Sequence, residues 1–394
     1  MRVGIFSDSY YPHISGVATS IEMLKRALEG MGHQVYIVAP NLENRKLIYD
    51  KKNKTIYLPG IKLGLYKLRL AETYSRKAMK IIKEEWKLDI VHTQTEFTVS
   101  RFGRTVARKL NIPVVHTYHT MYEDYVYYLT HGHFDKLARK AVVKIISNFC
   151  NNKCDRLIVP TNKIKEMFLD RYNIKKEINV IPSGIDIERF YLTNTIKKKS
   201  EEIRKKYNIE SDDFIIGSVG RVAAEKSYDE TIKNMQELVK YNKKMKFMLV
   251  GDGPDMDNLK KLTSQLKLDK NVIFTGLVDY DLMPVYYHVF DVMVSFSKTE
   301  TQGLTVVEGL AASLPTICIE DESFINTIQN GYNGYLFNDN EEYRKHIIDL
   351  AYDKELYKEM SMNAKNSVYN YSKEVFASNV LRVYHDAIKS GRDN

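Results

Sequence analysis

Short apolar runs alternate with amphipathic segments along almost the whole chain, and this alternation constrains the fold more than any other feature of the sequence. The apolar runs have the length of buried strands, whereas the segments between them carry apolar residues at helical spacing. Strands that alternate with helices build parallel sheets that are covered by helices. The sequence therefore predicts an α/β fold.

The predicted strands of the first half are RVGIFS, HQVYIVAP, DIVHTQ, IPVVHTYH, CDRLIVPT and INVIPSG. Those of the second half are FIIGSVG, KFMLVGDG, NVIFTGL, DVMVSFS and LPTICIE. Predicted helices lie near 17–30, 73–87, 100–110, 135–152, 163–172, 229–241, 255–268, 280–289 and 304–313, and the tail from 341 onward is mainly helical. Strands and helices alternate in this way along the sequence of a doubly wound sheet.

The chain has 394 residues, which is more than one ordinary domain holds, so we expect two domains. The lysine-rich segment 194–213 has little apolar content and predicts a connection between them. We therefore predict two Rossmann-like, doubly wound domains at 1–193 and 214–370, with a C-terminal helix at 371–394 that returns to the first domain. Two such domains usually bind their ligand in a cleft between the carboxyl ends of their strands.

Basic residues are concentrated in the first half of the chain. Residues 1–200 contain 35 Lys and Arg against 19 Asp and Glu, a formal charge of +16, whereas residues 201–394 contain 24 against 31, a charge of −7. The first half is therefore expected to meet an anionic partner. Two of its predicted helices have a positive face, which is formed by Arg101, Arg104 and Arg108 on one helix and by Lys136, Arg139, Lys140 and Lys144 on the other.

The segment TYSRKAMKIIKEEWK, residues 73–87, predicts an amphipathic helix with a basic border. Its apolar stripe consists of Tyr74, Ala78, Ile81, Ile82 and Trp86, and the residues that flank the stripe include Arg76, Lys77, Lys80 and Lys83. Such a helix can lie in an anionic membrane surface, where each basic residue contributes roughly 1 kcal/mol. The alternative is that the stripe packs on the helix's own sheet.

The sequence contains no uninterrupted apolar run of about 18 residues, which is the length that a membrane-spanning helix needs. Asp8 interrupts the first apolar run, so no secretory leader is predicted. The three cysteines, Cys150, Cys154 and Cys318, do not complete a zinc-binding set and are expected to be reduced core thiols. We therefore expect a cytoplasmic protein.

Residues suited to a phosphate-bearing ligand follow several predicted strands. Gly16 begins the helix after the first strand, where backbone N–H groups can face a phosphate. Arg221 and Lys226 lie in the turn after FIIGSVG, and two cations in such a turn match the charge of a diphosphate. A solvated surface position is the alternative for both cations.

The stretch SKTETQGLTVVEGLAASLP, residues 297–315, reads as a turn followed by a helix. Glu300 falls in the turn, and Gly303 allows the backbone to approach a ligand closely. The N–H groups of Leu304 and Thr305 point out of the helix start, and Glu308 lies inside the helix. The pattern outlines an anion site, and an ordinary helix with acidic early residues is the alternative.

His119 ends the predicted strand IPVVHTYH, and Tyr118, Tyr122 and Tyr125 are close to it in sequence. A histidine at the edge of a cleft can hydrogen-bond a sugar hydroxyl, and aromatic rings flank sugars or lipids well. A structural role for the histidine is the alternative.

Two kinds of pattern could suggest a metal, and we predict an obligatory metal site at neither. The HGH tripeptide at 131–133 has no further carboxylate or cysteine at a suitable spacing. The tripeptides DMD (255–257) and DYD (279–281) lie at predicted helix starts, where carboxylates cap the helix and interact favourably with its dipole.

Taken together, these motifs resemble those of the retaining glycosyltransferases of the GT-B kind, specifically family 4. Glu300 and Glu308 match the family's E-x7-E motif, and Arg221 with Lys226 matches its G-R-x-x-x-E-K diphosphate clamp. The stretch IPSGIDIERF is similar to its N-G-V-D signature. The resemblance covers essentially the whole chain, with the motifs in the same order.

Three positions depart from the common family pattern. Ser15 precedes Gly16 where paired glycines are usual, Ser183 replaces an asparagine, and ETQGL replaces E-G-F-G-L. None of these changes removes a charged residue. They are consistent with a subgroup of the family.

The resemblance implies a catalytic role for Glu300 and His119, which would contact the transferred sugar. Glu308 would bind the nucleotide ribose. The diphosphate would lie at the N–H groups of Leu304 and Thr305, beside Arg221 and Lys226, with Gly16 and Gly303 allowing close approach. Because the diphosphate can accept the proton of an acceptor that attacks on the same face, the reaction would need neither a protein nucleophile nor a cofactor, although Mg²⁺ could stimulate it.

Within the family, the segments MRVGIFSDSYYPHISGVATSI, HTYHTMYEDYVYYLTHGH and SKTETQGL are most similar to bacterial diacylglycerol glucosyltransferases. This similarity implies a peripheral enzyme on the inner face of the cell membrane that moves glucose from UDP-glucose to 1,2-diacylglycerol, for glycolipids and lipoteichoic acid anchors. The expected membrane and acceptor residues are Arg76, Lys77, Lys80, Lys83, Trp86, Arg101, Arg104, Arg108, Tyr122 and Tyr125.

Other partners stay open at this point. A phospholipid, a wall polymer or a small soluble acceptor would also suit the basic first half, and the donor could carry another hexose or another base. A nucleic-acid-binding protein is the alternative of another class, suggested by the pI of about 9.0, but no nucleic-acid-binding motif is present.

Overall fold

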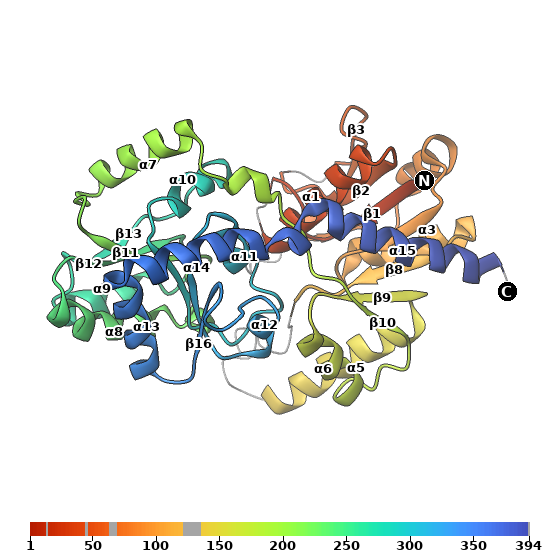
Figure 1. The fold of residues 1–394 in the computed structure, drawn as a ribbon. Coiled ribbons are helices and arrows are strands. Elements are labelled where there is room, and N and C mark those ends of the chain that lie inside the picture. The colour runs from red at the N-terminus through yellow and green to blue at the C-terminus, as the bar shows by residue number, and fades with distance from the viewer. Residues whose placement is uncertain (13–14, 44–45, 63–68, 121–134, 393–394) are drawn as a thin grey trace. The chain divides into compact units, whose positions relative to one another are not determined.

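The computed structural model describes residues 1–12, 15–43, 46–62, 69–120 and 135–392, which form two compact units (Figure 1). The first unit comprises Met1–Ile185 and Lys373–Asn394, and the second comprises Asp186–Ser372. Each unit is an α/β structure built on a parallel sheet. The predicted fold class, with two doubly wound domains, is confirmed.

The sheet of the first unit has eight strands in the order β10-β9-β8-β7-β1-β2-β4-β3, and all neighbouring pairs are parallel except β3 with β4. A separate antiparallel hairpin pairs β5 with β6. The strands are β1 (Arg2–Phe6), β2 (Gln34–Pro40), β3 (Ile48–Asp50), β4 (Thr55–Leu58), β5 (Gly60–Lys62), β6 (Arg69–Ala71), β7 (Ile90–Thr93), β8 (Val114–Thr117), β9 (Arg156–Val159) and β10 (Ile178–Val180).

Helices cover both faces of this sheet because successive side chains of a strand point to opposite faces. Val3 and Ile5 of β1 pack in one core with α1 (Gly16–Gly30) and α15 (Lys373–Arg392). Phe6 packs in another core with α3 (Thr98–Leu110) and α2 (Arg76–Ile81), which continues as a π-helical turn at Ile82–Trp86. A third core contains α5 (Asp135–Asn152) and α6 (Asn162–Asp170).

Helix α15 comes last in the described chain and packs against α1 in the first unit (Figure 1). Its inward side chains Phe376, Val380 and Tyr384 are almost completely buried among residues of α1 and of the central strands. The first unit therefore has a core that combines residues from both ends of the sequence.

The sheet of the second unit has six parallel strands in the order β13-β12-β11-β14-β15-β16. The strands are β11 (Phe214–Val219), β12 (Met245–Val250), β13 (Val272–Phe274), β14 (Val292–Ser295), β15 (Thr316–Ile319) and β16 (Gly334–Phe337). The helices are α7 (Asn194–Lys206), α8 (Tyr228–Tyr241), α9 (Met256–Gln265), α10 (Met283–Tyr287), α11 (Leu304–Ala311), α12 (Glu322–Ile325), α13 (Asn340–Tyr352) and α14 (Lys354–Ser367).

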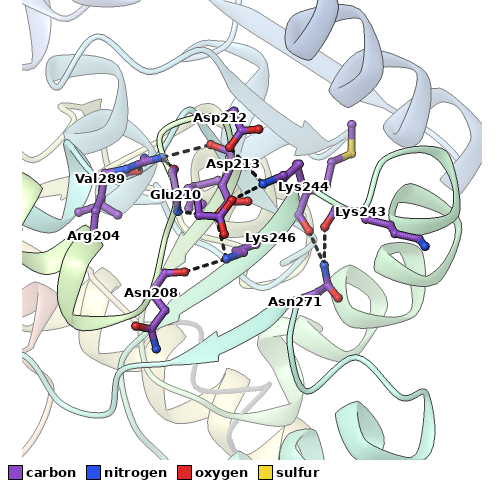
Figure 2. Close-up of polar contacts among 12 residues, drawn as sticks. Arg204, Asn208, Glu210, Asp212, Asp213, Lys243, Lys244, Lys246, Asn271 and Val289 are labelled. Carbon is purple, nitrogen blue, oxygen red and sulfur yellow. Dashed lines mark hydrogen bonds and ion pairs between the residues drawn. The ribbon is translucent and has the colours of Figure 1, made fainter.

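Segment 194–213, for which the sequence predicted a connection, contains α7 and belongs to the second unit. Arg204 ties the end of this helix to the unit by donating hydrogen bonds to the carbonyl oxygens of Val289, Glu210 and Asp213 (Figure 2). Lys246 pairs with the buried Asp213 at 2.7 Å. These contacts explain why a segment with few apolar residues is nevertheless folded.

Each sheet has a switch point, where the chain winds outward in opposite directions from two neighbouring strands. In the first unit this point lies between β1 and β7, and in the second it lies between β11 and β14. Ligands of doubly wound sheets bind at the carboxyl ends of such strands. The predicted site residues therefore belong to the turns that follow these strands and the adjacent β8.

No helix in the described part of the chain is both long enough and apolar enough to cross a membrane.

Candidate active site

The turns that follow β11 and β14 lie side by side because these strands are neighbours in the second sheet. Lys226 ends the 3₁₀ turn Ala224–Lys226, and its Nζ lies 2.5 Å from Oε1 of Glu300. The two side chains are 21% and 20% exposed. The carboxylate predicted to contact the sugar and a cation predicted to contact the diphosphate therefore form an ion pair that solvent can reach.

Arg221 forms a second ion pair in the same turn, with Glu225. The hydroxyl of Thr299 donates a hydrogen bond to the carbonyl oxygen of Glu225 at 3.4 Å and so connects the two turns. Arg221 remains partly exposed, so an anionic ligand can compete for its guanidinium group.

Helix α11 begins directly after Gly303, which has a φ of +74°. A Cβ atom at this position would lie 2.6 Å from Cε1 of Phe324, so both the backbone conformation and the space require glycine. The Gly303 carbonyl accepts the N–H groups of Val306 and Val307. No side chain caps the helix, so the N–H groups of Leu304 and Thr305 are available to an anion.

Glu308 lies inside α11, and only 5% of the residue is exposed. The hydroxyl of Tyr287 donates to its Oε2 at 2.7 Å, and the hydroxyl of Tyr280 lies 3.5 Å from its Oε1. Burial raises the pKa of Glu308 to about 7, although the two hydroxyls and the charge of Arg189 act in the opposite direction. This carboxyl group is consequently poised between its neutral and ionised forms near pH 7.

In the first unit, Gly16 is the first residue of α1, as the sequence predicted. Ser15 caps this helix, because its Oγ accepts the N–H of Ala18 at 3.1 Å and lies 2.8 Å from the hydroxyl of Ser9. The serine that departs from the family pattern thus stabilises the start of α1 through its side chain.

His119 follows β8 and is partly buried. Its Nε2 lies 2.5 Å from Oε1 of Gln94, which follows the neighbouring strand β7. Burial lowers the pKa of His119 to about 3, and the nearby His116 acts in the same direction. The imidazole is therefore neutral near pH 7.

The residues expected at a membrane surface fall into two groups. Arg76, Lys77, Lys80 and Lys83 are exposed on α2 and on the turn that follows it, and Arg101 and Arg108 are exposed on α3. Trp86 and Arg104 form the second group, because their side chains pack against other residues of the first unit.

The role predicted for Trp86 is wrong, because only 1% of this residue is exposed. Its ring stacks on Tyr36 with centroids 4.8 Å apart, and its indole N–H donates to the hydroxyl of Tyr49 at 3.1 Å. Ala78 and Ile82 of the same stripe are completely buried. The alternative prediction is correct for most of the stripe, since Ala78, Ile82 and Trp86 pack in the core of their own unit, whereas Tyr74 is 40% exposed.

The surface position predicted for Arg104 is also wrong. Its guanidinium group lies over the ring of Phe149, with 4.3 Å between Cζ and the ring centroid. Burial lowers its pKa to about 10. The face predicted for Arg101, Arg104 and Arg108 therefore consists of its two outer members. Tyr122, Tyr125, His131 and His133 lie outside the described residues, as do the side chains of Lys136 and Arg139.

Among the described residues, one group of acidic side chains is close enough together to hold a metal ion: Glu210, Asp212 and Asp213. Figure 2 shows that lysines approach the same carboxylates. Lys244 pairs with Glu210 and with Asp212, and Lys246 pairs with Asp213. Because each of the three carboxylates already pairs with a lysine of the protein, the group holds the segment that follows α7.

Comparison with known proteins places the chain in a family. Residues 14–189 match the family model "Glycosyltransferase Family 4", and residues 199–367 match "Glycosyl transferases group 1". The alpha-monoglucosyldiacylglycerol synthase of Acholeplasma laidlawii is 37% identical over 396 residues, which cover 98% of this chain and 98% of that protein. The chain is a family 4 glycosyltransferase. The enzyme is also 34% identical to the alpha-monoglucosyldiacylglycerol synthase of Streptococcus pneumoniae, over 99% of this chain and 87% of that protein.

Solved structures show the same fold. The Anabaena protein Alr3699/HepE, solved in complex with UDP-glucose, has a TM-score of 0.75 to this glycosyltransferase at 15% identity and covers 98% of this chain and 99% of its own. Sucrose-phosphate synthase from Thermosynechococcus elongatus also has a TM-score of 0.75, at 18% identity and with the same coverage of each chain. At such identities the likeness concerns the fold alone.

Sequence reasoning missed several residues that hold the predicted site residues in place. Tyr287 and Tyr280 contact Glu308, Glu225 pairs with Arg221, and Gln94 contacts His119. Gln94 could have been found from the sequence, because it is a polar residue at the carboxyl end of a strand beside the switch point. Tyr287 and Tyr280 could not have been found in this way, because only the fold brings their hydroxyls to α11.

Proposed function

We propose that this glycosyltransferase moves glucose from UDP-glucose to 1,2-diacylglycerol with retention of configuration, and that it works on the cytoplasmic face of the cell membrane. The main support for this proposal is sequence identity. The chain is 37% and 34% identical, over nearly its whole length, to two proteins named alpha-monoglucosyldiacylglycerol synthase. The charged turns of the second unit support a nucleotide-sugar donor, because cations and helix N–H groups meet there.

The ion pair between Lys226 and Glu300 suggests how the donor engages the site. A diphosphate would compete with Glu300 for the Lys226 ammonium group, while the sugar would offer hydroxyl donors to the released carboxylate. Arg221 could exchange Glu225 for the diphosphate in the same way. Both cations and the start of α11 would then stabilise the negative charge that develops on the leaving UDP.

Purified protein should convert UDP-[¹³C]glucose and diacylglycerol, in mixed micelles that contain anionic lipid, to a glucolipid with an α-linkage. Mass spectrometry identifies the product, and NMR identifies the anomer. UDP-galactose and UDP-N-acetylglucosamine test the choice of sugar, and parallel reactions with EDTA or Mg²⁺ test the metal requirement. Because the proposed site stabilises the leaving diphosphate with Arg221, Lys226 and the start of α11, we expect a product in EDTA, with or without stimulation by Mg²⁺.

The outcomes separate the proposed acceptor from the proposed chemistry. If UDP-glucose is hydrolysed but no glucolipid forms, diacylglycerol is the wrong acceptor, and phospholipids, wall polymers and soluble acceptors should be tested in the same assay. A β-linked product would contradict retention. If the protein neither binds nor consumes any nucleotide sugar and instead binds duplex DNA, the whole proposal fails.

The membrane contact requires a revised surface, because Ala78, Ile82 and Trp86 of the predicted stripe are buried. We propose that it consists of four exposed apolar residues, Ile61 (58%), Leu70 (41%), Tyr74 (40%) and Phe97 (43%), together with the basic residues Arg76, Lys77 and Arg101. Ile61 and Leu70 face each other across the hairpin. The N–H of Ala71 donates to the Thr98 hydroxyl at 3.0 Å, which brings the hairpin next to Phe97. Exposed apolar side chains beside cations fit an anionic bilayer.

Neutralising two basic residues of α2 that belong to this surface, with Arg76→Gln and Lys77→Gln, should weaken binding to phosphatidylglycerol vesicles by about 10- to 30-fold at low salt, since each basic residue contributes about 1 kcal/mol. The matched control is Lys197→Gln with Lys198→Gln, which changes the net charge equally on α7. Vesicle flotation measures both variants. Equal losses in both pairs would show that net charge alone drives binding and would contradict the proposed surface.

The apolar part of this surface is tested separately by Leu70→Glu with Phe97→Glu, compared with Met362→Glu on α14, where the methionine is 54% exposed. We expect loss of flotation for the first variant alone, while the donor affinity of both stays that of the wild type. If the first variant still floats with phosphatidylglycerol vesicles, the hairpin is not part of the contact.

A further inference from the structure

We propose that Gln94 is a positioning residue that holds the imidazole of His119 in the tautomer protonated on Nε2. This inference rests on the proposed function, because it assigns the state in which His119 meets the transferred sugar. It concerns a residue outside every motif on which the family resemblance was based.

The geometry of the contact determines the position of the proton. The Oε1 atom of Gln94 lies 2.5 Å from Nε2 of His119, and an amide oxygen only accepts hydrogen bonds. Nε2 must therefore carry a proton in this contact. In a neutral imidazole the other nitrogen, Nδ1, then becomes an acceptor, which suits a hydrogen bond from a sugar hydroxyl.

The orientation of the Gln94 amide is itself fixed by a second contact. Its Nε2 lies 3.2 Å from both ring nitrogens of His92, a buried residue of β7. A reversed amide would direct its oxygen at that ring and its NH₂ group at His119. In the observed orientation the NH₂ group lies over the face of the His92 ring, whose own pKa burial lowers well below its ordinary value, so the ring is neutral. An N–H group is attracted to the electron-rich face of a neutral ring, whereas an amide oxygen is not.

His92 is in turn anchored on both sides. Its Nδ1 lies 2.6 Å from the hydroxyl of Tyr384, and its Nε2 lies 2.7 Å from the hydroxyl of Thr117. Tyr384 belongs to α15, so the C-terminal helix supports the site through two intermediate side chains. Gln94 contacts His92 on one side and His119 on the other, and few rotamers satisfy both contacts. It can therefore fix the orientation and the tautomer of the His119 ring.

The contact that His119 makes with Gln94 is with a neutral amide, and the nearby charged groups contact other residues. His116 is buried, and both of its ring nitrogens have partners. Its Nδ1 lies 2.9 Å from the hydroxyl of Thr93, and its Nε2 lies 3.1 Å from Oε1 of Glu96. Glu96, which contacts His116 and not His119, the two neighbouring histidines and the buried Tyr384 are the titratable groups of this network among the described residues. A neutral amide, rather than a carboxylate, consequently faces His119, which favours the neutral imidazole.

The first test is NMR of the full-length protein carrying ¹⁵N-labelled histidine, because the two ring nitrogens of a neutral histidine have different shifts according to which one is protonated. We expect His119 to show the Nε2-protonated pattern in the wild type and a mixture of tautomers in Gln94→Leu. Assignment uses a His119→Asn sample. An Nδ1-protonated His119 in the wild type, or a pattern unchanged in Gln94→Leu, would overturn the proposal. This readout does not depend on activity, so it stays valid whatever the acceptor is.

The second test is kinetic. Gln94→Leu should lower kcat/KM for the sugar nucleotide by about 10- to 100-fold, while the affinity for UDP, whose proposed side-chain ligands Arg221, Lys226 and Glu308 all belong to the second unit, stays within about threefold. Gln34→Leu is the control, because it makes the same change at an exposed glutamine of β2, whose Oε1 accepts the hydroxyl of Tyr36 outside this network; its kcat/KM should stay within about threefold of the wild type. Equal losses in both variants would show that the substitution acts on the fold of the first unit in general and would contradict a positioning role for Gln94.

Gln94→Glu distinguishes positioning from packing. The carboxylate keeps an acceptor oxygen, but it also favours the imidazolium form of His119, because an opposite charge at hydrogen-bond distance raises the pKa of a histidine. We expect this variant to retain activity at high pH and to lose it as the pH falls, with an acidic limb that the wild type lacks. A pH profile parallel to that of the wild type would contradict the proposal.

Discussion

Replacing Glu300 by glutamine is expected to lower kcat about 100- to 1,000-fold, the size of effect that follows the loss of one preorganised polar group at a reaction centre. The affinity for UDP should not fall, since UDP has no sugar for this residue to contact. It should even rise, because the substitution releases Lys226 from an ion pair in which the charged atoms are 2.5 Å apart. Steady-state kinetics and calorimetry with UDP measure the two quantities.

The matched control for this variant is Glu230→Gln, which changes a glutamate of the same unit that pairs with Lys233 on α8. It should leave kcat and the affinity for UDP unchanged. A parallel fall of kcat and UDP affinity in Glu300→Gln would mean that Glu300 organises the diphosphate site instead of contacting the sugar. That result would contradict the role proposed for it.

Replacing Glu308 by glutamine should make the protein more stable above neutral pH while it weakens donor binding. Burial raises the pKa of this carboxyl group from 4.5 to about 7, so the folded state holds a proton that the unfolded state has already released at pH 6. Stability from this group therefore falls as the pH rises from about 4.5 through 7, by on the order of 3 kcal/mol in total. Glutamine has no charge to bury and avoids this loss.

Thermal unfolding at pH 5 and pH 8 tests this prediction. We expect Glu308→Gln to unfold at nearly the wild-type temperature at pH 5 and several degrees higher at pH 8. The affinity for UDP-glucose at pH 8 should fall by about 10- to 100-fold, as expected when hydrogen bonds to a charged group are lost. A variant that is less stable than the wild type at pH 8 would show that the hydroxyls of Tyr287 and Tyr280 stabilise the ionised carboxylate fully.

The central strands of both sheets were predictable because burial on both faces leaves a continuous apolar run in the sequence. RVGIFS became β1 and DVMVSFS became β14, each next to a switch point. The short strands β3, β4, β5, β6 and β16 were not predicted. They have only three or four residues each, and their partners rather than their own pattern hold them in place.

The placement of charged turns was also accessible from the sequence, since the carboxyl ends of parallel strands meet at one edge. The sequence could not predict which part of the protein, or which membrane, covers a given side chain. The stripe around Trp86 has the same periodicity whether a membrane or the core covers it, and Arg104 has the same spacing as its exposed neighbours. The contacts of Gln94 with His92 and His119 depend on strand order, which no local pattern records.

The packing of α15 on α1 has a consequence for synthesis of the chain. The core that contains Val3 and Ile5 also needs Phe376 and Val380, which emerge from the ribosome only after every residue of the second unit. Domains usually complete their folding in the order in which they are translated. Here the order is reversed: the N-terminal unit must wait with an uncovered apolar face, and the C-terminal unit can be the first to finish.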